Sequence, residues 1–165
     1  MGYLVLALII FGFDQLGKIL LYGYNISLIG DFLWLKTVFN TGAAWGSFSG
    51  GRWIFIAISS VCLVIFVWIL FSKKSIKSKL YKLSISLLLG GLLGNLFDRI
   101  VFEGVRDFIY LKFINFPVFN IADIAVTVGT ILLIVFILFY YKNYEKNLKT
   151  QTEEVKNNGE NDSRK

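Results

Sequence analysis

The sequence predicts an all-α membrane protein with four transmembrane helices and a small extracytoplasmic element that contains β-structure. Of its 165 residues, 56% are hydrophobic and 17% are aromatic, and the mean hydropathy is +0.65. Soluble domains average about 45–50% apolar residues, so the composition favours a membrane class. Four apolar stretches account for the excess, and each approaches the roughly 20 helical residues that cross a bilayer.

The second of these stretches is the clearest, because residues 53–71 include no charged side chain. The first lacks a basic n-region and a small-residue cleavage site, so we expect a retained anchor rather than a cleaved signal peptide. The third contains Gly90 and Gly94 at the small-xxx-small spacing that lets helices approach closely. The expected spans are residues 3–22, 53–71, 81–97 and 120–141.

Basic residues in the loops predict the orientation of these spans. The loop after the second span is rich in lysine and is expected in the cytoplasm. The tail, residues 142–165, also begins with lysines and is too polar to bury a core, so we expect a disordered cytoplasmic segment. Both termini then lie inside and the two longer loops outside. The net charge of +6 follows from this topology and requires no nucleic-acid partner.

The first outer loop, residues 23–52, is expected to hold the β-containing element of a single membrane domain, residues 1–141. Strand-forming residues fill positions 32–39, and Asn40 follows in a turn sequence.

The residue types present exclude several kinds of catalysis. The chain has no histidine and one cysteine, Cys62. Triads that need histidine, histidine-ligated metals, internal disulfides and thiolate zinc sites are therefore excluded. Carboxylates, amides, hydroxyls and a few basic groups remain.

Polar residues inside the spans are informative, since an Asp near the middle of a membrane helix costs about 2.5–3.5 kcal/mol on insertion scales. Asp14 and Lys18 are four residues apart and can pair on one helix face. A simple ion pair that lets this helix insert into the membrane explains these two residues as well as a functional role does. Asn95, Asp98 and Arg99 close the third span, where a polar helix end with Arg99 reaching the head groups explains any one of them.

Asp107 and Asp123 are the strongest candidates for catalysis. Asp107 lies in an apolar stretch that returns toward the outer surface, and Asp123 shares a helix face with Asn120 just inside that surface. Two adjacent carboxylates share one proton, so one can take a proton from water while the other protonates a carbonyl oxygen. Membrane carboxylates also form cation or proton relays. Their spacing therefore leaves a peptidase and a small transporter or proton-relay subunit equally open, and a structural scaffold is a third possibility.

Five motifs, in order, make the chain resemble the bacterial lipoprotein signal peptidases (signal peptidase II). They are Asp14-Gln15-Leu16-Gly17-Lys18, Asn40-Thr41-Gly42-Ala43-Ala44-Trp45-Gly46, Gly94-Asn95-Leu96-Phe97-Asp98-Arg99, Val105-Arg106-Asp107-Phe108-Ile109 and Phe119-Asn120-Ile121-Ala122-Asp123. Each motif alone is weak, but five in this order on a four-helix hydropathy pattern are specific.

The resemblance implies an aspartyl endopeptidase of the bacterial cytoplasmic membrane, with its active site near the outer face. The family removes the signal peptide of prolipoproteins, cutting before a cysteine that carries diacylglycerol with its chains in membrane lipid. Asp107 and Asp123 match the two catalytic aspartates. Six further positions match residues that line or support the site: Asp14, Asn40, Asn95, Asp98, Arg99 and Asn120.

The resemblance also implies that no metal and no organic cofactor take part. The outer loop would correspond to the family's cradle over the substrate, and globomycin-type cyclic peptides are the expected inhibitors. No oligomer is implied.

Three positions depart from the family's pattern. Gly17 stands where Thr or Ser is usual, Tyr110 where an acidic residue is often found, and Ile124 where Ser or Ala is frequent. Both matched aspartates are retained. The departures bear on substrate preference and on the support of Asp107.

Overall fold

The computed structural model describes residues 2–42, 51–72, 76–147 and 150. Part of the Asn40–Gly46 motif, the basic loop residues Lys73 and Lys74, and the tail from residue 151 onward lie outside the described residues.

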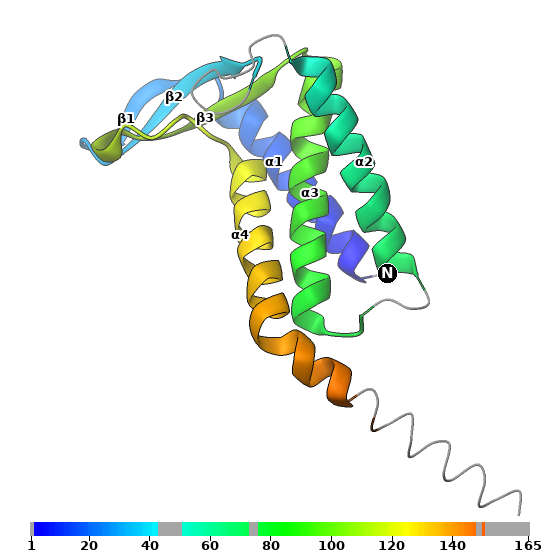
Figure 1. Ribbon diagram of the computed structural model, residues 1–165. Helices are drawn as coiled ribbons and strands as arrows, with labels where there is room; N and C mark the ends of the chain where they lie inside the picture. The colour runs from blue at the N-terminus through cyan, green and yellow to red at the C-terminus, as the bar shows by residue number, and fades with distance from the viewer. Residues whose placement is uncertain (1, 43–50, 73–75, 148–149, 151–165) are drawn as a thin grey trace, which may run out of the picture.

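Four long helices form the body of the described part of the molecule (Figure 1). Each is long and apolar enough to cross a membrane. Together with a small three-stranded sheet, they confirm the predicted fold class. The helices are α1 (Gly2–Leu21), α2 (Arg52–Phe71), α3 (Lys79–Val101) and α4 (Ile121–Val135).

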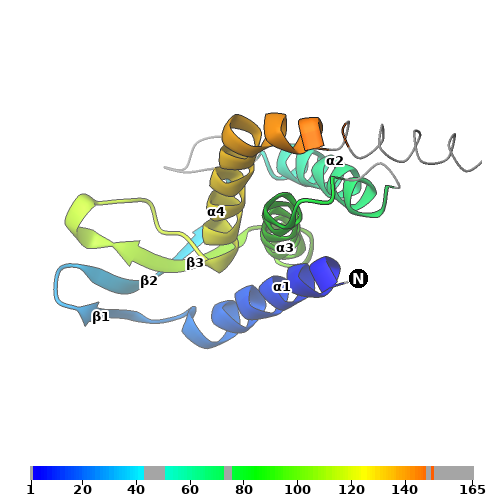
Figure 2. The same ribbon diagram turned by 90° about the horizontal axis from the view of Figure 1, so that it is seen from below.

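Helix α3 is the centre of the bundle, and Figure 2 shows it among the other three helices. It packs against α1, α2 and α4 and contributes most of the main apolar core, including Ile85, Leu88 and Leu89. In contrast, Ser59 and Leu63 are the buried residues of α2. The outer helices therefore present their remaining apolar surface to the lipid, as expected of a membrane bundle.

Helix α4 continues beyond Val135 through a π-helical turn, Phe136–Tyr140, and then as a helix to Asn147. The sequence predicts a boundary near Tyr141. Phe136 is buried, and its ring lies 5.2 Å from that of Tyr81 and 6.4 Å from that of Tyr144. A π turn changes the local helix direction, and Figure 1 shows the lower part of α4 bending here.

The sheet consists of β1 (Asn25–Ile29), β2 (Leu33–Asn40) and β3 (Val105–Leu111), paired antiparallel in that order. It lies at the end of the bundle opposite to the first residues of α1 (Figure 1). Strands β1 and β2 come from the outer loop, where the sequence predicts β-structure. Strand β3 was not predicted: it is seven residues long, and short apolar runs do not distinguish strand from helix.

Glycines allow α3 to lie close to its neighbours. A Cβ atom on Gly91 would lie 2.5 Å from the carbonyl oxygen of Ala122 in the first turn of α4, and a Cβ on Gly94 would meet the Asp14 carboxylate of α1. No side chain fits at either position without movement of backbone or of a buried charge. The small-residue pattern of α3 therefore sets how closely α1 and α4 approach.

We expect Gly91→Ala to lower the free energy of unfolding by about 1–3 kcal/mol, because the added methyl group meets backbone atoms of α4. Gly12→Ala is the matched control. A Cβ at Gly12 has no neighbour within 4 Å, and alanine is the better helix former. Thermal unfolding in detergent measures both variants, and equal midpoints for the two would contradict the close packing at Gly91.

Candidate active site

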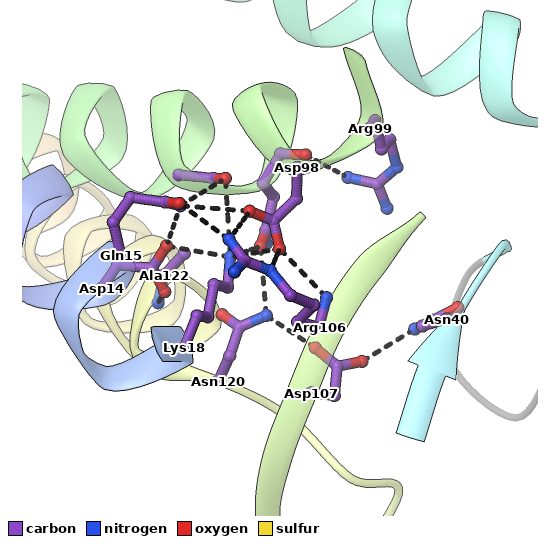
Figure 3. A network of polar contacts seen from close by, with 12 residues as sticks. Asp14, Gln15, Lys18, Asn40, Asp98, Arg99, Arg106, Asp107, Asn120 and Ala122 are labelled. Atoms are coloured by element: carbon purple, nitrogen blue, oxygen red, sulfur yellow. Dashed lines mark hydrogen bonds and ion pairs between the residues drawn. The ribbon is translucent and has the colours of Figure 1, made fainter. Parts of the chain in front are cut away.

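The predicted polar residues gather where α1, α3 and the start of α4 meet strand β3 (Figure 3). Four carboxylates or amides there are at most 2% exposed, and the ammonium-bearing side chain of Lys18 is 1% exposed. Such burial is tolerated only when the groups satisfy one another. The four are Asp14, Asp98, Asp107 and Asn120.

Two cations and two anions form a charge cluster composed of Asp14, Lys18, Asp98 and Arg106. The Lys18 ammonium lies 2.8 Å from the Asp14 carboxylate, the ion pair expected from their spacing, and 3.3 Å from that of Asp98. The Arg106 guanidinium lies 2.8 Å from Asp98. The formal charges of the cluster sum to zero, so each buried charge is compensated within the cluster.

The charge cluster joins four elements of the fold. An Asp14 oxygen on α1 accepts the backbone N–H of Ala122 in the first turn of α4, at 2.9 Å. An Asp98 oxygen on α3 accepts the backbone N–H of Arg106 on β3, at 3.0 Å. Ala122 directly precedes Asp123, and Arg106 directly precedes Asp107. The cluster therefore fixes the backbone beside each candidate aspartate.

Three asparagines, Asn40, Asn95 and Asn120, surround these two aspartates and are called here the amide frame. The two Asp107 oxygens accept the side-chain N–H groups of Asn120 at 2.6 Å and Asn40 at 3.1 Å. The two Asp123 oxygens accept the Asn95 side chain at 2.7 Å and the Asn120 backbone N–H at 3.0 Å. Within the described part of the chain, each carboxyl oxygen thus accepts one hydrogen bond from a neutral amide.

Asn120 is shared by both carboxyl groups because it is the N-cap of α4. Its side-chain oxygen accepts the Asp123 backbone N–H at 3.0 Å, which completes a capping box with the Asp123 side chain. Asparagine at the N-cap and an acidic residue three positions later are typical of helix starts. The local sequence that begins α4 therefore also links Asp123 to Asp107.

The two aspartates line one cavity of about 290 Å³. Among the hydrogen bonds of the described residues, none joins the two carboxyl groups directly; Asn120 bridges them. Asn40 and Arg99 line the same cavity, and residues 116–119 form an apolar wall. The Arg99 guanidinium lies over the Phe55 ring, with its carbon 4.9 Å from the ring centre.

The eight predicted site residues therefore lie in two layers. Four of them face the cavity: Asn40, Arg99, Asp107 and Asp123. Behind these, Asn95 and Asn120 contact the two aspartates, and Asp14 and Asp98 both pair with Lys18.

Burial raises the pKa of the Asp107 carboxyl group to about 7, and the nearby charge of Asp123 adds to this effect. The hydrogen bonds from Asn40 and Asn120 and the positive charge of Lys18 act in the opposite direction. Asp107 therefore changes its protonation state near neutral pH.

Sequence reasoning did not assign Gln15 or Arg106 to the site. The Gln15 amide donates to Asp98 at 3.2 Å, and its oxygen accepts Arg106 at 2.9 Å. From the sequence, Arg106 is identified only as part of the motif around Asp107. Its position directly before Asp107 in an apolar stretch is the signal that indicates a buried partner.

The three departures from the family pattern have structural counterparts. A Cβ on Gly17 would lie 2.7 Å from the end of the Ile121 side chain, so Ile121 occupies the space of the missing side chain. The Tyr110 hydroxyl donates to Asn115 at 2.7 Å. Ile124 is 43% exposed on the surface of α4.

In the part of the chain that the structure describes, no group of three or more His, Cys, Asp or Glu side chains is placed to hold a metal ion. The described polar side chains that line the cavity are the two carboxyl groups, the Asn40 amide, the Arg99 guanidinium and the Thr127 hydroxyl.

Four spanning helices, three of them joined by a neutral charge cluster, and two carboxyl groups facing one cavity define a multi-pass membrane protein with an internal carboxylate site. Residues 6–139 match the family model of signal peptidase (SPase) II. The chain belongs to the signal peptidase II family, and it is therefore a bacterial membrane peptidase by family.

Individual relatives agree with this assignment. The lipoprotein signal peptidase of Latilactobacillus sakei subsp. sakei (strain 23K) is 36% identical over 145 residues, which cover 85% of this chain and 95% of the relative. That of Clostridium tetani (strain Massachusetts / E88) is 41% identical over 124 residues, 73% of this chain and 79% of the relative. A bacterial membrane enzyme solved at 2.3 Å resolution superimposes with a TM-score of 0.76 at 33% identity, covering 83% of this chain and 87% of the other.

We expect Asp98→Asn to lower the free energy of unfolding by about 3–5 kcal/mol. The substitution removes the carboxylate that pairs with both Lys18 and Arg106. Asp31→Asn is the matched control: Asp31 also pairs with a lysine, Lys112, but at an exposed site, where an ion pair contributes little. Unfolding midpoints in detergent measure the difference. A midpoint for Asp98→Asn equal to that of the control would show that the cluster does not hold the fold together.

Proposed function

We propose that this protein removes the signal peptide of prolipoproteins by cutting before a diacylglyceryl-modified cysteine, with Asp107 and Asp123 as its catalytic pair. The observation that carries the proposal is that both carboxyl groups line one cavity and bind the same asparagine, Asn120. Membership of the signal peptidase II family favours this function over a transporter or proton relay.

The proposed reaction is amide hydrolysis without a covalent intermediate. The ionised member of the pair takes a proton from a water molecule, whose oxygen attacks the scissile carbonyl carbon. The protonated member gives its proton to the carbonyl oxygen, and a gem-diol forms. The proton taken from water then passes to the leaving nitrogen, the C–N bond breaks, and one hydroxyl returns its proton to the second carboxyl group. Both carboxyl groups end in their starting states.

The amide frame suits this chemistry because it orients the carboxyl groups without adding charge. A cation in direct contact would hold a carboxyl group ionised, and the pair would lose its transferable proton. Limited access of water lowers the local dielectric constant and strengthens the hydrogen bonds to the developing charge.

The cavity and the lipid-facing side of α4 together fit a substrate that is half peptide and half lipid. Thr127 of α4 lines the cavity, while Ile124, Val128 and Ile131 on the same helix are exposed. In our proposal the peptide enters the cavity and the acyl chains lie in membrane lipid along this apolar surface. Globomycin-type cyclic peptides would compete for the same cavity.

We further propose that the sheet end of the bundle faces outward and that both termini are cytoplasmic. The first residues of α1 lie at the end opposite to the sheet (Figure 1), and the basic loop and tail lie on their side in the predicted topology. The aspartates then lie near the outer membrane surface, where the scissile bond of a signal peptide lies.

We expect Asp107→Asn and Asp123→Asn each to reduce cleavage by at least about 10³-fold while the protein still folds, because either change removes a proton-transferring group. Mass spectrometry of a diacylglyceryl-modified precursor, before and after incubation with purified protein, measures cleavage. An unmodified precursor tests the lipid requirement.

Asp31→Asn, outside the cavity, is the control and should cleave normally. Thermal unfolding checks that the two site variants remain folded. Substantial cleavage by either folded variant would exclude the proposed pair.

We expect kcat/KM to follow a bell-shaped dependence on pH. On the alkaline side, activity falls as pH rises through about 7, because Asp107 loses the proton that the reaction needs. On the acidic side, activity falls when both carboxyl groups are protonated and neither can take a proton from water. Initial rates across this range, with chemistry rate-limiting, test the dependence, and a constant rate through neutral pH would contradict it.

A further inference from the structure

We infer that the two aspartates have different roles before substrate binds: Asp123 carries the negative charge and is the general base, whereas Asp107 carries the proton and is the general acid. This inference rests on the proposed function and divides its two proton transfers between named residues. It follows from what surrounds each carboxyl group.

The start of α4 favours a carboxylate at Asp123. Asp123 is the third residue of that helix and accepts the Asn120 backbone N–H at 3.0 Å. Unpaired backbone N–H groups and the helix dipole give a helix N-terminus a partial positive charge. A hydrogen bond from backbone N–H to a carboxylate in this position is stronger than one to a neutral acid.

A buried ammonium group acts on the same carboxyl group through one amide. Lys18 donates to the Asn95 side-chain oxygen at 3.0 Å, and the Asn95 nitrogen donates to Asp123 at 2.7 Å. Hydrogen bonds in a chain polarise one another. The Asn95 amide therefore presents a strengthened donor to Asp123.

Among the described residues, Asp107 accepts no backbone N–H and no hydrogen bond from an amide that Lys18 contacts, although the charge of Lys18 also acts on it. It lies within β3, and strands have only small net dipoles. Its donors in the described part of the chain are two asparagine side chains, and it is 2% exposed. Burial without a charged donor favours the neutral acid, in agreement with the raised pKa of Asp107.

Within the residues that the structure describes, the charged groups near the pair belong to α1, α3 and β3. The cation next to Asp107 in sequence, Arg106, is held by Asp98. The remaining groups are Lys18 and Asp14 of α1, paired with each other, and Arg99 of α3, which interacts electrostatically with both aspartates.

The assignment fixes the direction of each proton transfer. Asp123 takes a proton from water as the water oxygen bonds to the carbonyl carbon, and Asp107 gives its proton to the carbonyl oxygen. As the C–N bond breaks, Asp123 passes its proton to the leaving nitrogen and Asp107 recovers a proton from the gem-diol.

Infrared spectroscopy of protein labelled with ¹³C at the aspartate carboxyl carbon tests the assignment without substrate. The stretching band of a protonated carboxyl group is separate from that of a carboxylate. At about pH 6, below the pKa of Asp107, we expect the band in the unsubstituted protein and in Asp123→Asn, and its absence in Asp107→Asn. In Asp123→Asn the titration midpoint should fall, because the neighbouring negative charge is gone.

A third variant leaves both carboxyl groups in place. Asn40→Ala removes a donor that favours ionised Asp107, so the midpoint of the band should rise. If the band came from a protonated Asp123 instead, its titration midpoint would not rise in this variant. Asp31→Asn, at an exposed ion pair, is the control and should leave the band unchanged.

A band retained in Asp107→Asn and lost in Asp123→Asn would reverse the assignment, and identical titrations of the two variants would show an equally shared proton and refute it. The precursor assay separates this failure from that of the function. If the protein cleaves the lipidated precursor but the variants titrate alike, only the assignment of roles fails. If it does not cleave, the proposed function fails whatever the spectra show.

Discussion

The burial of Lys18 between two carboxylates is the constraint on which the rest of the structure depends. An uncompensated charge at this depth would cost several kcal/mol, so Asp14 and Asp98 must both reach the ammonium group. They come from different helices, and each also accepts a backbone N–H from a third or fourth element. Satisfying one cation therefore fixes the relative positions of α1, α3, α4 and β3.

This constraint separates positioning from chemistry. Formal charges hold the backbone next to each candidate aspartate, through Ala122 and Arg106, while neutral amides contact the carboxyl groups themselves. If a lysine or arginine supplied those contacts, both aspartates would stay ionised and no proton would be available for transfer. The charge cluster can therefore be tightly paired without suppressing the titration of Asp107 near neutral pH.

Hydropathy was sufficient to predict the four spans, and the cost of carboxylates in apolar segments singled out Asp107 and Asp123. Strand β3 could not be predicted from hydropathy. Its partner strand lies far away in the sequence, and a short apolar run fits a strand or a helix. The contact of Arg106 with Asp98 depends on that strand, so it was missed as well. The continuation of α4 past Tyr141 depends on ring contacts of Phe136 that spacing does not reveal. The roles of the site residues remain predictions that the proposed experiments test.

Gly17 of the first motif, where Thr or Ser is usual, shows how this chain holds α1 against the start of α4 and against β3 with different residues. Ile121, the first residue of α4, projects its side chain to where a residue-17 side chain would lie, and Phe108 of β3 closes the same space. A hydroxyl-bearing residue at position 17 would force these groups apart, because its Cβ would lie within 3.1 Å of both. Ile121 lies two residues before Asp123 and Phe108 one residue after Asp107. Glycine at position 17 and isoleucine at position 121 therefore pack α1 against the two backbone segments that carry the proposed catalytic pair.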